Sequence, residues 1–122
     1  MRSLILTGSF IALTACVADV ASKQPFTLDT AQIEEAKYYV SYNLRDPATA
    51  QFRNIHGSNV IDKNGMRESF VCGEVNSKNL VGAYVGYTPF IFNVGTKATQ
   101  VASRDLPIAA NWIDVANYQK IC

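Results

Sequence analysis

Apolar residues recur with helical spacing between residues 29 and 45, where they form one stripe along a helix. The stripe consists of Ile33, Ala36, Val40 and Leu44. Asp29 or Thr30 can cap this helix, and Gln32 follows Asp29 at the spacing of a capping box. Tyr38 and Tyr42 form an i, i+4 pair off the stripe. They are interpreted either as a binding patch or, preferably, as rings that lie on the edge of a sheet.

The remaining segments alternate strand-forming runs with turn signals. Pro47 predicts a short turn or helix over 47–50, and Phe52 after it should point into the core. Gly82, Gly86 and Pro89 indicate a bulge or bend within the third run. Strands are predicted over 52–56 (extended by 60–61), 68–75, 81–94 and 98–103, with turns at 62–65 and 95–97, a polar loop over 76–80 and a weaker helical pattern over 106–120.

This order predicts an α+β fold. One long N-terminal helix would pack on a three- to four-stranded antiparallel sheet, with a short C-terminal helix. With 122 residues and 48% hydrophobic residues, the chain is long enough for one globular domain, predicted over 29–122. Eleven basic and ten acidic residues give a net charge of +1 without a basic run, which argues against nucleic acid as a partner.

Residues 1–15 have the features of an export signal. Arg2 supplies positive charge, and the apolar stretch over 4–13 is too short to span a bilayer. The sequence Leu13-Thr14-Ala15-Cys16 resembles the lipobox of bacterial lipoproteins. That resemblance implies that Cys16 is lipidated and begins the mature chain, with 16–28 as a flexible tether. The alternative is ordinary signal cleavage nearby, with Cys16 lost or left as a thiol. In Gram-negative lipoproteins Asp after the cysteine retains the protein in the inner membrane, so Val17 implies the outer membrane.

Three cysteines are an odd number for an exported protein. If Cys16 carries lipid, Cys72 and Cys122 remain as a pair that can form a disulfide in an oxidising compartment. The alternative is two free thiols, with Cys72 as a buried apolar side chain. One histidine, His56, and two distant cysteines do not make a metal site, so no metal or other cofactor is expected.

Two segments resemble a group of small exported proteins and lipoproteins of Gram-negative bacteria. Residues 46–53, DPATAQFR, resemble its motif DPxSAxFR, and residues 71–90 resemble VCGEVNAKNxxGGYxGFxPF. The match covers about residues 29–92, with Thr49 and Ser77 where the motifs more often have Ser and Ala. No activity is attached to this group.

The second motif contains a candidate binding patch. It consists of Glu74, Asn76, Lys78, Asn79, Tyr84 and Tyr87. Strand alternation places Glu74 on the face of Cys72 at the margin of the core, where a carboxylate needs partners. In one interpretation these residues close a connection between strands through bonds to the backbone. In the other, they form a polar recognition patch beside aromatic rings.

Sequence motifs of hydrolases, metalloproteases and nucleotide-binding proteins are absent from the sequence. The sequence therefore predicts a non-enzymatic, lipid-anchored binding or accessory module on the periplasmic side of the outer membrane. Its expected partners are the membrane, through the lipid on Cys16, and a protein of the envelope. The alternative function is a small periplasmic inhibitor of an envelope-degrading enzyme such as lysozyme, by analogy alone.

Overall fold

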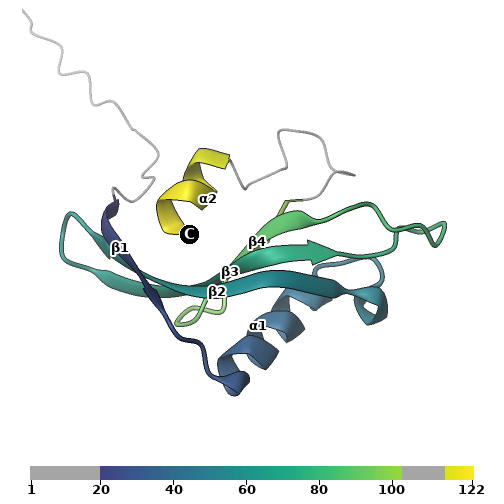
Figure 1. Ribbon diagram of the computed structural model, residues 1–122, viewed down its shortest axis with the longest axis horizontal. Helices are drawn as coiled ribbons and strands as arrows, with labels where there is room; N and C mark the ends of the chain where they lie inside the picture. Colours follow the sequence, from purple (N-terminus) through teal and green to yellow (C-terminus); the bar gives the residue numbers. More distant parts are fainter. Residues whose placement is uncertain (1–19, 103–114) are drawn as a thin grey trace, which may run out of the picture.

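The main body of the molecule is an antiparallel sheet (Figure 1). The computed structural model describes residues 20–102 and 115–122, so the predicted leader over 1–15 and Cys16 lie outside the described residues. In the described part the sheet has five strands that follow one another in chain order. They are β1 (Val20–Phe26), β2 (Gln51–Asp62), β3 (Arg67–Asn76), β4 (Thr88–Asn93) and β5 (Thr99–Val101).

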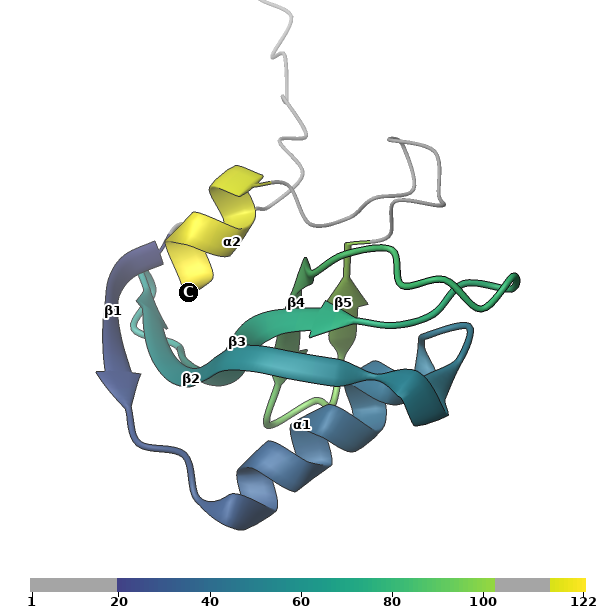
Figure 2. The same cartoon turned by 45° about the vertical axis from the view of Figure 1, so that its right-hand side comes forward.

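Two helices lie on opposite faces of the sheet (Figure 2). The helix α1 (Thr30–Tyr42) packs on one face, and α2 (Val115–Ile121) packs on the other. The short 3₁₀ helix η1 (Pro47–Thr49) connects α1 to β2. Alternation along β3 explains the two layers, because successive side chains point to opposite faces.

The larger core lies between α1 and the sheet. Its buried members are Ala36, Val40, Val71, Val75, Phe90 and Phe92. Phe52 packs against this cluster as predicted, and its ring meets that of Phe90 edge to face at 5.7 Å. The smaller core lies under α2 and contains Val60, Phe70, Cys72 and Ile91, with Tyr118, Ile121 and Cys122 packed on it.

The predicted architecture, one long helix on a three- to four-stranded sheet, is wrong. The sheet has a further strand, β1, formed by residues assigned to the flexible tether. The five middle residues of β1 are exposed, and Pro25 interrupts the pattern, so no alternation marks it as a strand. An edge strand tolerates both features, since only one of its sides must bond to a neighbour.

Further element boundaries differ from the predictions, since β2 runs unbroken from Gln51 to Asp62 and β5 covers only Thr99–Val101. The helix is shorter, because it ends at Tyr42 instead of residue 45, although its Asp29–Gln32 capping box is confirmed. The strand predicted over 81–94 is confined to β4, and a loop occupies 77–87. Gly82 and Gly86 have φ values of 80° and 97°, which an extended strand does not accommodate. The helical pattern over 106–120 is described only from residue 115.

Close packing at Gly57 fixes β1 on the sheet. Phe26 lies opposite Gly57 in the ladder between β1 and β2. A Cβ atom at residue 57 would approach the Phe26 ring to 2.7 Å, a distance that real side chains do not reach. Because glycine has no side chain, Gly57 leaves the space that the Phe26 ring at the end of β1 occupies.

Candidate functional site

The carboxylate of Glu74 has a partner that the sequence analysis did not assign to it. Arg53 lies opposite Glu74 in the ladder between β2 and β3, and its Nε forms an ion pair with Oε2 of Glu74. The guanidinium of Arg53 also covers the ring of Tyr87, 3.8 Å from its centroid. Arg53 is the last residue of the segment that resembles DPxSAxFR, and Glu74 belongs to the second motif. The joint occurrence of these two motifs was the sequence signal that could have suggested the pair.

The two asparagines of the candidate patch bind the backbone of their own loop. Asn76 Oδ1 accepts a hydrogen bond from the N–H of Gly86 at 3.0 Å. Asn79 Oδ1 accepts from the N–H groups of Val81 and Ala83, both at 3.1 Å. Their amide oxygens are therefore used to shape the loop over 77–87, in agreement with the structural interpretation of these two residues.

Lys78 and Tyr84 attach this loop to η1 through Thr49. The N–H of Lys78 donates to Thr49 Oγ1 at 3.0 Å, and the Tyr84 hydroxyl donates to the Thr49 carbonyl at 3.3 Å. The ammonium of Lys78 lies 5.5 Å from the centroid of the Tyr84 ring. The two motifs that were quoted separately thus pack against each other at one end of the sheet.

The six patch residues do not converge on one point. Glu74 and Tyr87 meet through Arg53, whereas Lys78 and Tyr84 meet beside Thr49. The side chain of Arg53 is half-exposed, so its guanidinium can accept a further polar partner at this end. The structure therefore offers one polar site at Arg53 and one aromatic site at Tyr84.

Large apolar side chains are exposed around this same end of the molecule. The exposed residues, called here the far-end surface, are Tyr38, Tyr42, Leu80, Val81 and Tyr84. Tyr42 is 78% exposed and Val81 is 85% exposed, so neither is covered by the sheet. The preferred interpretation of Tyr38 and Tyr42 as rings resting on a sheet edge is therefore wrong. Leu80 was placed at the end of the predicted polar loop over 76–80 and Val81 at the start of the strand predicted over 81–94, and neither was singled out as a surface residue.

An open groove of about 500 Å³ lies on the α1 side of the far-end surface. Tyr38 and Tyr42 of α1 line it together with Pro47 and Phe52. Pro47 belongs to η1, whose Thr49 holds the Tyr84 hydroxyl. Figures 1 and 2 both show the loop between β3 and β4 at the end of the molecule opposite to the start of β1.

The predicted cysteine pair is bonded in the structure. Cys72 of β3 and Cys122 form a disulfide, with 6.0 Å between their Cα atoms. The Ser58 hydroxyl donates to the carbonyl of Ile121, which adds a second attachment for α2. Burial, and then the charge of Glu74, raise the pKa of the Tyr118 hydroxyl above 10.0. The helix α2 is therefore fixed over the smaller core, on which Tyr118 packs.

Comparison with known proteins places the chain in no family. No protein family matches it, no curated protein is similar to it, and no solved structure is similar to it. Among residues 20–102 and 115–122, no three metal-ligating side chains come together. His56 lies within β2, where its Nδ1 is 2.8 Å from the carbonyl oxygen of Asn54. No helix in the described part is long and apolar enough to cross a membrane.

Proposed function

We propose that this protein is a lipid-anchored module of the bacterial envelope that binds a protein partner through its far-end surface. The lipid would be attached to Cys16, as the lipobox resemblance implies. Anchoring by acyl chains is strong when two or more chains enter the bilayer, because each buried methylene contributes about 0.8 kcal/mol. The Cys72–Cys122 disulfide is consistent with an exported chain.

The observation that carries the proposal is the position of the exposed apolar side chains. Five of the six large exposed apolar residues in the described part of the chain belong to the far-end surface. Scattered apolar residues are normal on a protein, but contiguous patches are typical of interaction sites. Tyrosine is favoured at interfaces because one rigid side chain offers both apolar area and a hydroxyl.

The positions of the start of β1 and of the loop over 77–87 at opposite ends of the molecule support the same proposal. The first strand begins at Val20, four residues after Cys16, whereas the loop over 77–87 lies at the opposite end (Figure 1). A chain anchored through Cys16 would hold the start of β1 near the bilayer. The far-end surface would then point away from the membrane, where an envelope protein can reach it.

Site-specific photocrosslinking in living cells tests this function. A photoreactive amino acid replaces Tyr42 or Val81, and in a control chain it replaces Thr96, an exposed residue between β4 and β5. We expect one envelope protein to crosslink from both far-end positions and not from residue 96. Equal crosslinking from all three positions would contradict a dedicated surface. Inhibition of a lysozyme by the purified chain would instead favour the inhibitor function.

The anchor is tested separately by Cys16→Ser. We expect the variant to keep its leader and to lose acylation. Unchanged acylation and unchanged fractionation with the outer membrane would contradict the proposed anchor.

A further inference from the structure

The loop between β3 and β4 contains a closed hairpin that projects beyond the end of the sheet (Figures 1 and 2). This finger, residues 78–84, is closed at its base by the β-bridge between Lys78 and Tyr84. Across its tip, the N–H of Asn79 donates to the carbonyl of Ala83 at 2.8 Å, and the N–H of Gly82 donates to the carbonyl of Asn79 at 3.1 Å. The Asn79 side chain accepts two further backbone hydrogen bonds. The finger therefore has one defined shape before any partner arrives.

Thr49 fixes the base of the finger to η1. Its hydroxyl donates to the carbonyl of Asp46 at 2.9 Å and accepts from the N–H of Lys78 at 3.0 Å. Its carbonyl accepts from the Tyr84 hydroxyl at 3.3 Å. Because Thr49 contacts both strands of the finger at its base, it is the positioning residue that sets the direction in which the finger points.

The tip of the finger carries two adjacent aliphatic side chains. Leu80 is 78% exposed, and Val81, at 85%, is the most exposed large apolar residue of the described part of the chain. Residues 79–83 include no charged side chain. A rigid convex apolar tip loses little conformational entropy on binding, so it favours insertion into a concave apolar site.

One positive charge lies at the base of the finger. The ammonium of Lys78 is 5.5 Å from the centroid of the Tyr84 ring, and it takes part in no ion pair within the described residues. Lys78 is also the only charged residue of the finger. Charge complementarity therefore requires an acidic group on the partner, beside the apolar site that receives the tip.

We propose that the finger inserts Leu80 and Val81 into an apolar pocket with an acidic rim on a protein partner. The inference rests on the proposed function, and it states which part of the far-end surface enters the partner and what chemistry the partner presents. A protein is the occupant because the finger lies at the end opposite to the start of β1, which the proposed anchor would hold near the bilayer. Thr49 contributes by holding the finger in the orientation that binds.

Photocrosslinking from residue 42, which lies outside the finger, measures this insertion. The full chain carries the photoreactive amino acid in place of Tyr42, and the yield of its crosslink to the partner is compared at equal chain abundance. Leu80→Asp or Val81→Asp places a carboxylate in the apolar pocket and should lower that yield at least about tenfold.

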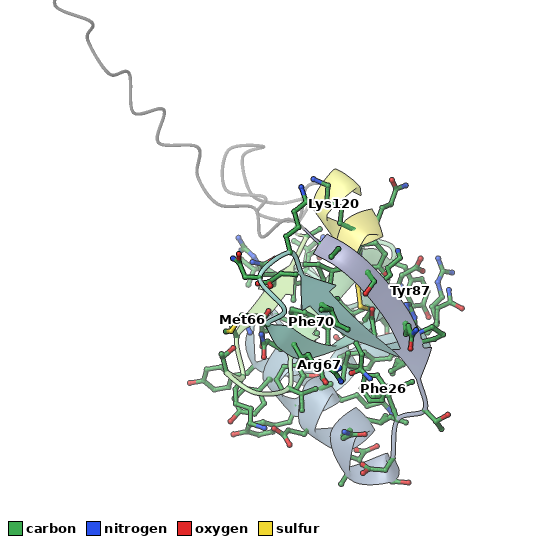
Figure 3. All side chains as sticks on the ribbon, turned by 90° about the vertical axis from the view of Figure 1, so that its left-hand side faces the viewer. Phe26, Met66, Arg67, Phe70, Tyr87 and Lys120 are labelled. Carbon is green, nitrogen blue, oxygen red and sulfur yellow. A yellow bond between two sulfur atoms is a disulfide. The ribbon has the colours of Figure 1, made fainter. Side chains whose placement is uncertain are left out.

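Met66→Asp is the matched control, because it makes the same chemical change at an exposed apolar residue elsewhere. Met66 is 63% exposed and lies in the turn between β2 and β3, at the end of the molecule that Figure 3 views. The crosslink yield from residue 42 should be unchanged in this variant.

Two further variants test the acidic rim and the positioning residue. Lys78→Gln removes the charge at the base of the finger and should lower the yield about threefold. Thr49→Val removes the hydroxyl while it preserves the shape of the side chain, and it should also lower the yield about threefold. Thr49→Ser keeps the hydroxyl and should restore the yield. Thermal denaturation checks that each variant is folded, so that a fall in yield reports binding.

The outcomes separate this inference from the proposed function. If the chain altered only at residue 42 crosslinks to no protein, the proposed function and the finger are overturned together. A crosslink that Leu80→Asp and Val81→Asp leave unchanged overturns the finger and keeps the proposed function. A photoreactive amino acid at residue 81 that captures phospholipid instead of protein also overturns the inference, because the occupant would be a lipid surface.

The two supporting roles fail separately. Equal yields for Thr49→Val and Thr49→Ser would contradict the positioning role of Thr49. A yield for Lys78→Gln equal to that of the chain altered only at residue 42 would contradict the acidic rim.

Discussion

The guanidinium of Arg53 lies on the ring of Tyr87, with 3.8 Å between Cζ and the ring centroid, while Nε of the same side chain pairs with Glu74. Arg53 of β2 therefore contacts both Glu74 of β3 and Tyr87 at the end of the loop over 77–87. The pair is partly exposed, with 53% of the Arg53 side chain and 32% of the Glu74 side chain accessible. Water and salt therefore screen much of its attraction.

Removing Arg53 should destabilise the protein more than removing Glu74. Glu74→Gln deletes the ion pair and should lower the free energy of unfolding by less than about 1 kcal/mol. Arg53→Ala also deletes the stack on Tyr87 and should cost about 1–2 kcal/mol. Urea denaturation measures both values, and Arg53→Lys serves as a control that keeps the charge without the planar group. Equal losses for Glu74→Gln and Arg53→Ala would contradict a role for the stack.

A side chain at residue 57 should weaken the attachment of β1. Gly57→Ala places a Cβ against the Phe26 ring and should cost about 1–3 kcal/mol through overpacking. Gly95→Ala is the matched control, since the nearest atom to its new Cβ is 3.4 Å away. Thermal denaturation compares the two variants. A Gly57→Ala protein as stable as Gly95→Ala would show that β1 does not pack as described.

Breaking the Cys72–Cys122 disulfide should substantially lower the free energy of unfolding of the domain. The bond closes a loop of 50 residues, for which the chain-entropy model gives about 4 kcal/mol. The double variant Cys72→Ala with Cys122→Ala should lose up to that amount and expose the smaller core to a hydrophobic dye. Reduction of the unaltered chain is the control, because it opens the same bond without a substitution. A loss below about 1 kcal/mol in both would contradict the account.

The side chain of Asn79 should determine the order of the loop over 77–87. Asn79→Ala leaves two backbone N–H groups without their acceptor and should cost about 1–2 kcal/mol. Limited proteolysis should then cut the loop faster. Asn79→Asp keeps an acceptor oxygen and should preserve protection. Equal cleavage of Asn79→Ala and the unaltered chain would contradict a structural role.

Alkaline pH should reveal the environment of Tyr118. Burial, followed by the charge of Glu74, raises its pKa in the folded state above 10.0, so folding opposes loss of the proton. The unfolded chain releases that proton more readily, and stability must therefore fall as pH rises above about 10. Tyr118→Phe should reduce this fall, as measured by urea denaturation across the alkaline range. An unchanged slope in the variant would contradict the assignment.

Sequence reasoning identified the features whose signal is local. The capping box of Asp29 and Gln32 requires two residues three positions apart, and the structure contains it. The Cys72–Cys122 pair followed from counting once Cys16 was set aside, and the bond is present. In each case the chemistry itself restricted the alternatives to a small number.

The features that sequence reasoning missed depend on partners distant in the chain. β1 has almost no apolar pattern by which the sequence could reveal it. Its position is set instead by hydrogen bonding to β2 and by the space over Gly57. The strand predicted over 81–94 failed because Asn76 and Asn79 bind backbone N–H groups of that segment, which its apolar residues do not indicate. Arg53 was quoted in a motif, yet its pairing with Glu74 requires the register of two strands.

The central claim is that the chain is exported and then acylated at Cys16, and intact mass spectrometry of the protein purified from its own cells tests it most directly. The account predicts a mature chain that begins at Cys16 and carries the mass of a diacylglycerol and any further acyl group. It also predicts incorporation of labelled palmitate that Cys16→Ser abolishes. A native chain that retains residues 1–15, or one that begins without acyl groups, would contradict the account.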